Sequence, residues 1–304
     1  MRDNIKKYTD EFLTYVEKSN RFSPNTLAAY KNDLDKFVEF LREKGIRSIK
    51  KTNDKLALEY LDYLKGILGE KSVMRNISSL KTFFNYLKRE GKFSRKNPFD
   101  NIKFRGLGPR EIPTLTVKEV KKLTKVLRPS GFIESRDMAL ILFIYNTGLK
   151  ATEASNALLK NLDLKNATYT CVAGGKKRVI PFSKSLIPVL EHYLEERKKL
   201  LKRVRIKNPA KKYLFINRRG GKITRQTVYI VVQKKADEAR LNKNVTPSML
   251  RNSLAMHLLS SGTREDIVKD IMGYATLVPK FPYLPEARRT RFEYLATHPA
   301  FKKR

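Results

Sequence analysis

The chain has 304 residues, of which 41% are hydrophobic, a length and composition typical of two folded domains and not of wholesale disorder. Its 65 Lys and Arg against 30 Asp and Glu give a net charge of +35, which favours a polyanionic partner, nucleic acid before an anionic membrane surface. A single cysteine excludes an internal disulfide, and one cysteine with three histidines argues against a metal site. The absence of a long apolar run or signal core predicts a cytoplasmic protein with no membrane partner.

The first 105 residues predict a bundle of helices without a sheet. In four stretches, apolar side chains recur at helical spacing and short links separate one stretch from the next: 3–19, 23–45, 53–67 and 70–90. This part has 24 Lys and Arg against 14 Asp and Glu, a net charge of +10, and the remainder has 41 against 16, a net charge of +25. Both parts are therefore basic, and the second is the more basic.

The segment from 92 to 113 interrupts the helical pattern with Pro and Gly among basic residues. We place the linker itself at 106–113, between a domain at 1–105 and a domain at 114–304. A basic linker between basic domains suits a clamp that closes around a rod-like polyanion. An ordinary solvated linker has the same composition, so both interpretations stay open.

The second domain is predicted to be mainly helical with a small antiparallel sheet. A helix begins near Thr116, and a strongly apolar helix ends at Thr147 and Gly148. Residues 168–182 alternate around a Gly-Gly turn, which is typical of a β-hairpin, and LFIN at 214–217 predicts a further short strand. The remaining helices are expected at 184–201, 224–240, 247–261 and 264–272, ahead of a proline-containing tail at 275–304.

Six segments in order along the chain resemble tyrosine recombinases of the phage-integrase and Xer type. SPNTLAAYKNDLDKFVEFL (23–41) and RNISSLKTFFNYLKREGKFSRKNPF (75–99) resemble helices of the core-binding domain of that family. IPTLTVKEVKKL (112–123) resembles the entry to its catalytic domain. Three further segments resemble its catalytic motifs: RDMALILFIYNTGLKATEA (136–154), TPSMLRNSLAMHLLSSG (246–262) and DIVKDIMGYA (266–275).

The resemblance implies a mainly α protein, with an N-terminal SAM-like core-binding helical bundle and a C-terminal DNA breaking-rejoining domain that contains a small antiparallel β-sheet. It further implies a clamp on duplex DNA, self-association on that DNA, and strand exchange through a phosphotyrosine intermediate. In this chemistry a tyrosine attacks a DNA phosphate, and arginine forks hold the charge that develops on the phosphate oxygens. It needs no metal and no small-molecule cofactor.

Matched residue by residue, the resemblance assigns a diverged catalytic set. The first catalytic arginine falls on Lys150, which keeps the charge but loses the planar fork. In the His-x-x-Arg motif the arginine falls on Arg251 and the histidine on Ser248, which we expect at the DNA. The His or Trp of the next helix falls on Tyr274, whose hydroxyl can donate one hydrogen bond.

The hairpin lysine that protonates the leaving oxygen should lie at Ala173 or Gly174, and neither side chain can donate a proton. Lys176 or Lys177 could replace it only with a changed turn register, so Lys176, Lys177 and Arg178 are predicted to contact DNA phosphates; simple solvated charges are the alternative.

The nucleophile stays open between two tyrosines, with neither of them as the third alternative. Family spacing indicates Tyr283, which lies between two prolines, whereas the local Thr-x-x-x-Tyr pattern favours Tyr294.

Three functions follow. The favoured one is a DNA-binding member of this family, engaged in site-specific recombination or integration, in which cleavage is degraded. The second is an active but divergent recombinase. The third is a general basic nucleic-acid-binding protein.

Overall fold

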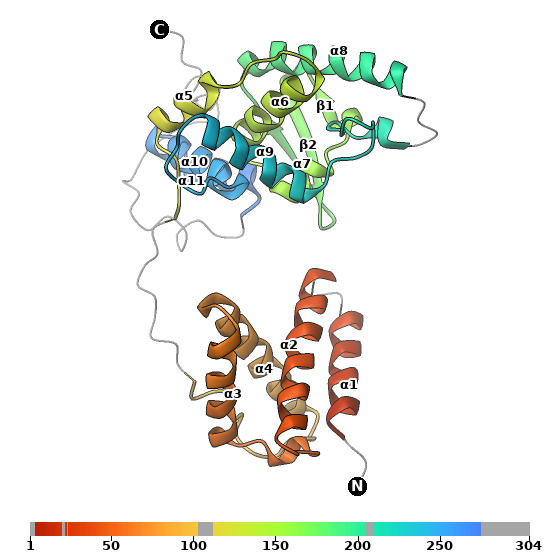
Figure 1. Ribbon diagram of the computed structural model, residues 1–304, viewed down its shortest axis with the longest axis vertical. Coiled ribbons are helices and arrows are strands. Elements are labelled where there is room, and N and C mark those ends of the chain that lie inside the picture. Colours follow the sequence, from red (N-terminus) through yellow and green to blue (C-terminus); the bar gives the residue numbers. More distant parts are fainter. Residues whose placement is uncertain (1–3, 20–21, 23, 103–111, 205–208, 275–304) are drawn as a thin grey trace. The chain divides into compact units, whose positions relative to one another are not determined.

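The computed structural model describes residues 4–19, 22, 24–102, 112–204 and 209–274 (Figure 1). Its contacts divide the chain into two compact units, Met1–Arg110 and Glu111–Arg304. Each unit has a separate hydrophobic core. Among the described residues, no helix is long and apolar enough to cross a membrane.

The first unit contains four α-helices, which confirms the predicted helical bundle: α1 (Asn4–Lys18), α2 (Pro24–Glu43), α3 (Asp54–Ile67) and α4 (Glu70–Arg89). Their apolar stripes meet in a core rich in aromatic rings, in which Phe37 packs edge-on against Tyr60 and Phe84. Asp33 of α2 is fully buried, yet its carboxylate accepts hydrogen bonds from Asn76 and Ser79 of α4. These polar contacts therefore join α2 to α4, as the contact between Phe37 and Phe84 does.

The second unit is mainly helical, as predicted. Its helices are α5 (Val117–Lys125), α6 (Phe132–Thr147), α7 (Ala151–Ser155), α8 (Ile187–Arg203), α9 (Arg225–Glu238), α10 (Pro247–Ser260) and α11 (Glu265–Met272). Helix α6 is buried on every side and contacts α8, α9 and α10, so it forms the centre of this unit. Thr116 and Glu119 cap α5 reciprocally, which explains why that helix begins where the sequence predicted.

A three-stranded antiparallel sheet in the order β1-β2-β3 lies beside these helices: β1 (Leu162–Asp163), β2 (Thr168–Ala173) and β3 (Lys176–Pro181). The predicted hairpin at 168–182 is confirmed. Gly174 and Gly175 have φ angles of 56° and 73°, the left-handed conformation that a two-residue hairpin turn requires. Strand β1 has only two residues and was not predicted from the sequence.

The strand predicted at 214–217 was wrong. The segment makes only isolated bridges there, between Leu158 and Tyr213 and between Ile216 and Lys222. Leu214, Phe215 and Ile216 are fully buried in the core. A short apolar run is typical of a buried strand and equally of a buried irregular segment. This run fills the core without forming the hydrogen-bond ladder of a strand.

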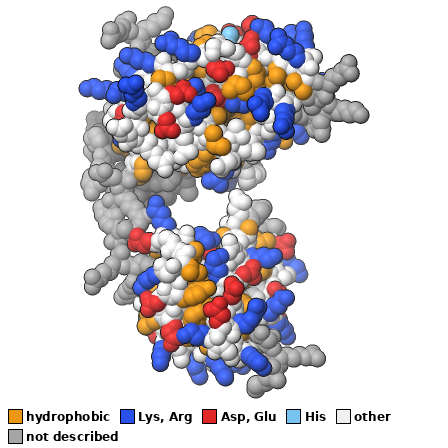
Figure 2. Space-filling view, viewed as in Figure 1, with side chains coloured by type: hydrophobic (Ala, Val, Ile, Leu, Met, Phe, Trp, Pro, Cys, Tyr) orange, Lys and Arg blue, Asp and Glu red, His pale blue; other side chains and the backbone are white. Residues whose placement is uncertain are grey.

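Lys and Arg side chains are spread over the visible face of each unit rather than gathered in one stripe, and Asp and Glu side chains lie among them (Figure 2). Exposed basic groups thus surround both units on this face.

Candidate functional site

A tight turn between α6 and α7 positions the first predicted site residue. Gly148 ends α6 in the left-handed conformation, with φ of 62°, and its N–H donates to Ile144 O at 2.8 Å. A side chain at this position would come within 2.5 Å of the Met272 sulfur of α11, so the close approach requires glycine. The turn places Lys150 at the start of α7 and Glu153 in the first turn of that helix.

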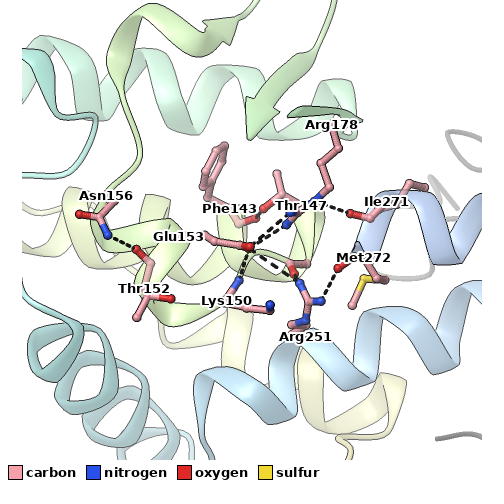
Figure 3. A network of polar contacts seen from close by, with 11 residues as sticks. Phe143, Thr147, Lys150, Thr152, Glu153, Asn156, Arg178, Arg251, Ile271 and Met272 are labelled. Atoms are coloured by element: carbon pink, nitrogen blue, oxygen red, sulfur yellow. Dashed lines mark hydrogen bonds and ion pairs between the residues drawn. The ribbon is translucent and has the colours of Figure 1, made fainter. Parts of the chain in front are cut away.

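Glu153 is the centre of the polar contacts in Figure 3. Its carboxylate accepts two hydrogen bonds from the Arg178 guanidinium of β3, at 2.7 and 3.2 Å, and one from the Lys150 backbone N–H at 2.8 Å. The side chains of Glu153 and Arg178 are only 7% and 18% exposed. Burial raises the pKa of Glu153, but the hydrogen bonds of Arg178 and Lys150 outweigh it, so its pKa lies below the ordinary value.

Arg251 of α10 is almost fully buried beside this carboxylate. Its two terminal nitrogens donate to the backbone oxygens of Gly148 and Met272, and one of them lies 4.0 Å from the Glu153 carboxylate. The ring of Tyr274 covers the guanidinium, with its centre 4.7 Å from Cζ. Burial lowers the pKa of Arg251, although guanidinium stays charged at any physiological pH.

Two guanidinium groups therefore flank one carboxylate, and Lys150 contacts the same carboxylate through its backbone N–H. The charges of Lys150, Arg178, Arg251 and Glu153 all act on the buried thiol of Cys171, whose pKa burial raises. Lys150 is exposed, so its ammonium can meet a ligand from solvent. A cluster with two net positive charges and guanidinium donors can bind a phosphate oxygen. Within the described part of the chain, no group of three or more His, Cys, Asp or Glu could hold a metal ion.

Of the residues that the resemblance assigns, Arg251 contacts the ring of Tyr274, and Lys150 and Arg251 both lie beside Glu153. The Tyr274 hydroxyl lies 3.5 Å from the side-chain oxygen of Asn252, the residue after Arg251. Both nucleophile candidates, Tyr283 and Tyr294, lie outside the described residues.

The hairpin register separates the three basic residues of β3. Lys176 pairs with Ala173, Lys177 with Val172 and Arg178 with Cys171. Paired residues share a sheet face and successive residues alternate, so Lys176 lies on the same face as Arg178, and Lys177 lies on the other. Lys176 is exposed and lies on the same sheet face as Arg178, next to the Gly-Gly turn.

Arg178, expected on DNA, instead has protein partners on all three guanidinium nitrogens. Besides the two bonds to Glu153, its Nε donates to Ile271 O of α11 at 3.1 Å. The ion pair joins β3 to α7, 25 residues apart in the chain, and no local spacing signals it.

Arg225 and Tyr229 form a polar cluster next to Ser248 that was not predicted from the sequence. Ser248 is exposed in the first turn of α10, and Arg225 of α9 lies 3.5 Å from the Tyr229 hydroxyl. The hydrogen bond from Arg225 lowers the pKa of Tyr229, burial opposes this, and a hydrogen bond to Ser248 lowers it further. The spacing of Arg225 and Tyr229, one helical turn apart, is visible in the sequence, whereas their approach to α10 is not.

Comparison with known proteins identifies the family. Residues 9–91 match the phage integrase N-terminal SAM-like domain, and residues 113–278 match the phage integrase family. The tyrosine recombinase XerC of Oceanobacillus iheyensis is 31% identical over 98% of this chain and 97% of its own. The chain therefore belongs to the phage integrase family of tyrosine recombinases.

Solved structures show the same fold. The Tn1549 transposon integrase in complex with a circular intermediate DNA has a TM-score of 0.73 at 19% identity, and the match covers 95% of this chain and 96% of that one. The XerH recombinase bound to a palindromic difH substrate has a TM-score of 0.71 at 24% identity, with 93% and 84% covered.

Proposed function

We propose that this protein binds duplex DNA as a member of the tyrosine recombinase family, and that its capacity to cleave DNA is degraded. The observation that carries the proposal is that the site keeps its positive charge while the donors that cleavage needs are missing or bound to the protein. DNA binding needs cations near phosphates, whereas cleavage needs particular donors in fixed places.

Several features support DNA as the partner. The net charge is +35, and exposed Lys and Arg lie over the visible faces of both units (Figure 2). The site itself holds the guanidinium groups of Arg178 and Arg251 beside a single carboxylate, Glu153, which Lys150 contacts through its backbone N–H. Structural relatives with the same fold were solved with DNA bound.

Two features support degraded cleavage. The resemblance implies a proton-donating lysine at Ala173 or Gly174, and the turn there contains no side-chain donor. Arg251, the one catalytic arginine that the sequence retains, has its two terminal nitrogens bonded to Gly148 O and Met272 O. A phosphate would have to compete with these carbonyls or use the remaining N–H groups. Losing one such donor commonly costs about 2.7–4 kcal/mol of transition-state stabilisation.

One observation favours a second candidate, an active but divergent recombinase. Lys176 lies directly across from Ala173 and on the same sheet face. Its flexible side chain could supply from β3 the ammonium that β2 lacks. In this alternative Lys150 takes the part of the first arginine and Tyr274 donates to the phosphate.

A nicked suicide duplex, which traps any covalent protein–DNA adduct, distinguishes the two candidates. We expect wild-type protein to retard the duplex on a native gel and to give no adduct on a denaturing gel. Lys150→Arg should not produce an adduct either, because the leaving-group acid would still be missing. A cleavage-competent relative on its own site serves as the positive control.

An adduct formed by wild type would overturn the proposal. In that case Tyr283→Phe or Tyr294→Phe should abolish it and thereby identify the nucleophile. Lys176→Ala should also abolish it, while the matched change on the other sheet face, Lys177→Ala, should leave it. Equal binding to duplex DNA and to structured RNA would instead favour a general nucleic-acid-binding protein.

We further propose that copies of the chain associate on DNA and that the protein acts in the cytoplasm. Sedimentation with and without a duplex tests the first point, because self-association on DNA requires a complex that contains more than one chain.

A further inference from the structure

A groove with no acidic residue in its lining lies between α8, Leu159 and Lys211. Its volume is about 400 Å³, and its walls are three leucines and four cations: Leu159, Leu194, Leu201, Arg197, Lys198, Lys202 and Lys211. A second hollow of about 720 Å³ continues it, since it shares Leu159 and Lys211, and its other residues also include no carboxylate. In Figure 1, α8 runs along the edge of its unit opposite to the tip of the β2–β3 hairpin.

Helix α8 contributes residues to the wall of the groove at regular spacing. Leu194, Arg197, Lys198, Leu201 and Lys202 stand at positions i, i+3, i+4, i+7 and i+8, the spacing of a single face of α8. The leucines are half-buried, and Lys198 and Lys202 are exposed beside them. The groove therefore combines an apolar wall with a basic rim.

Arg197 carries a buried charge that no anion balances. The side chain belongs to a residue that is only 6% exposed, and one terminal nitrogen of the Arg197 guanidinium donates to Lys211 O and Tyr213 O, at 2.7 and 2.8 Å. Its Nε has no hydrogen-bond partner, and no carboxylate among the described residues lies within ion-pair distance. Burial lowers the pKa of this group. A buried cation with neutral partners only is destabilising, and an anion in the groove would relieve it.

We propose that this groove is a docking site for an acidic, amphipathic peptide segment of a partner protein, whose apolar side chains cover the leucines and whose carboxylates meet Arg197 and the lysines. Charge complementarity selects an acidic occupant. The leucine wall argues against a DNA backbone, which offers no apolar group to cover it, and against a simple inorganic anion for the same reason. The proposal does not depend on the proposed DNA function of the other site.

The test uses the full chain and a fluorescein-labelled peptide in which leucines recur at helical spacing and the other residues are glutamate and alanine. A peptide of the same composition in scrambled order reports purely electrostatic binding, because it has the same charge. Fluorescence polarisation at moderate salt measures both. We expect the amphipathic peptide to bind about tenfold more tightly than the scrambled one, which corresponds to about 1.4 kcal/mol.

Variants locate the binding. The double variant Lys198→Glu/Lys202→Glu should weaken binding of the amphipathic peptide about tenfold or more. Lys121→Glu/Lys122→Glu, the same change of charge on exposed residues of α5, is the matched control and should change binding less than about twofold. Leu201→Gln, which alters no charge, should also weaken it. Circular dichroism checks that each variant is folded.

Three results would overturn the proposal. Equal affinity for the two peptides would reduce the binding to net charge, and equal weakening by the groove variant and the α5 control would place it elsewhere. If Lys198→Glu/Lys202→Glu weakened duplex DNA binding more than the α5 control does, but weakened peptide binding no more than that control, the groove would be a DNA contact instead.

Discussion

Replacing Glu153 by glutamine tests whether the ion pair at the centre of the site holds the second unit together. The substitution keeps the shape of the side chain but removes its charge, and it leaves the Arg178 guanidinium beside a neutral amide. Breaking a buried ion pair by removing one partner typically costs about 3–5 kcal/mol, because the other charge stays buried and unpaired. Arg178 is 18% exposed and the amide oxygen can still accept one hydrogen bond, so we expect less.

We therefore predict that Glu153→Gln lowers the free energy of unfolding by roughly 2–3 kcal/mol. In a unit of this size that corresponds to a fall in Tm of roughly 4–12 °C. Differential scanning calorimetry of the full chain is the appropriate assay, because it can resolve a transition of one unit from that of the other.

Asp266→Asn provides the matched control. Asp266 also forms a two-pronged ion pair with an arginine, Arg264, but these side chains are 57% and 51% exposed. Exposed pairs are well solvated in both states, so this variant should unfold close to wild type. If Glu153→Gln and Asp266→Asn shifted the transition equally, the reasoning from burial would fail.

The same prediction has a pH dependence. The pKa of Glu153 is lower in the folded chain than its ordinary value, so its contribution to stability is present above that value and is lost as the pH falls. The difference in Tm between wild type and Glu153→Gln should be full at neutral pH and should shrink below roughly pH 4. A difference that is constant from pH 7 to pH 3 would contradict the assigned ionisation.

Three further predictions concern the backbone, the units and the charge. Gly148→Ala should lower the free energy of unfolding by about 2–4 kcal/mol, because alanine is strained in the left-handed conformation and its side chain meets Met272. Gly174→Ala, where the added side chain meets open space, should lower it by only about 1–2 kcal/mol. Equal losses of stability in urea unfolding would remove the steric argument. Limited proteolysis should cut first between about 103 and 113, and early cuts inside the helices would speak against two domains joined there. Duplex DNA affinity should fall steeply with salt, by about 0.9 log units per phosphate contact per tenfold salt, and a flat response would reject a clamp.

Apart from the short α7, the helices were predictable because each carries its own signal. The capping pair at Thr116 and Glu119 and the apolar stripes in both units locate α-helices to within a few residues. The Gly-Gly turn located the hairpin for a similar reason, since two left-handed residues in a row define it. The short strand β1 and the irregular core segment at 214–216 have no such local signal, because packing against distant residues decides their conformation.

The candidate site was only half predictable. The sequence placed Lys150, Arg251 and Tyr274 near one another through the family resemblance, and in the structure Arg251 contacts Tyr274 while Lys150 and Arg251 both lie beside Glu153. It could not show that Arg178 turns inward to Glu153, because that contact follows from the packing of the hairpin against α7 and α11.

Burial explains which residues of the site match the family pattern and which depart from it. Arg251 falls where the resemblance expects an arginine, and it and the neighbouring Glu153 both hold separate elements together: Glu153 joins α7 to β3, and Arg251 joins the turn after α6 to the end of α11. Their loss would destabilise the unit whether or not it cleaves DNA. Lys150 and Ser248 depart from the pattern, and both are exposed, so changing them removes few protein contacts. A chain under no requirement to cleave DNA would keep the first pair for its fold and lose the second, which is the distribution found in this protein.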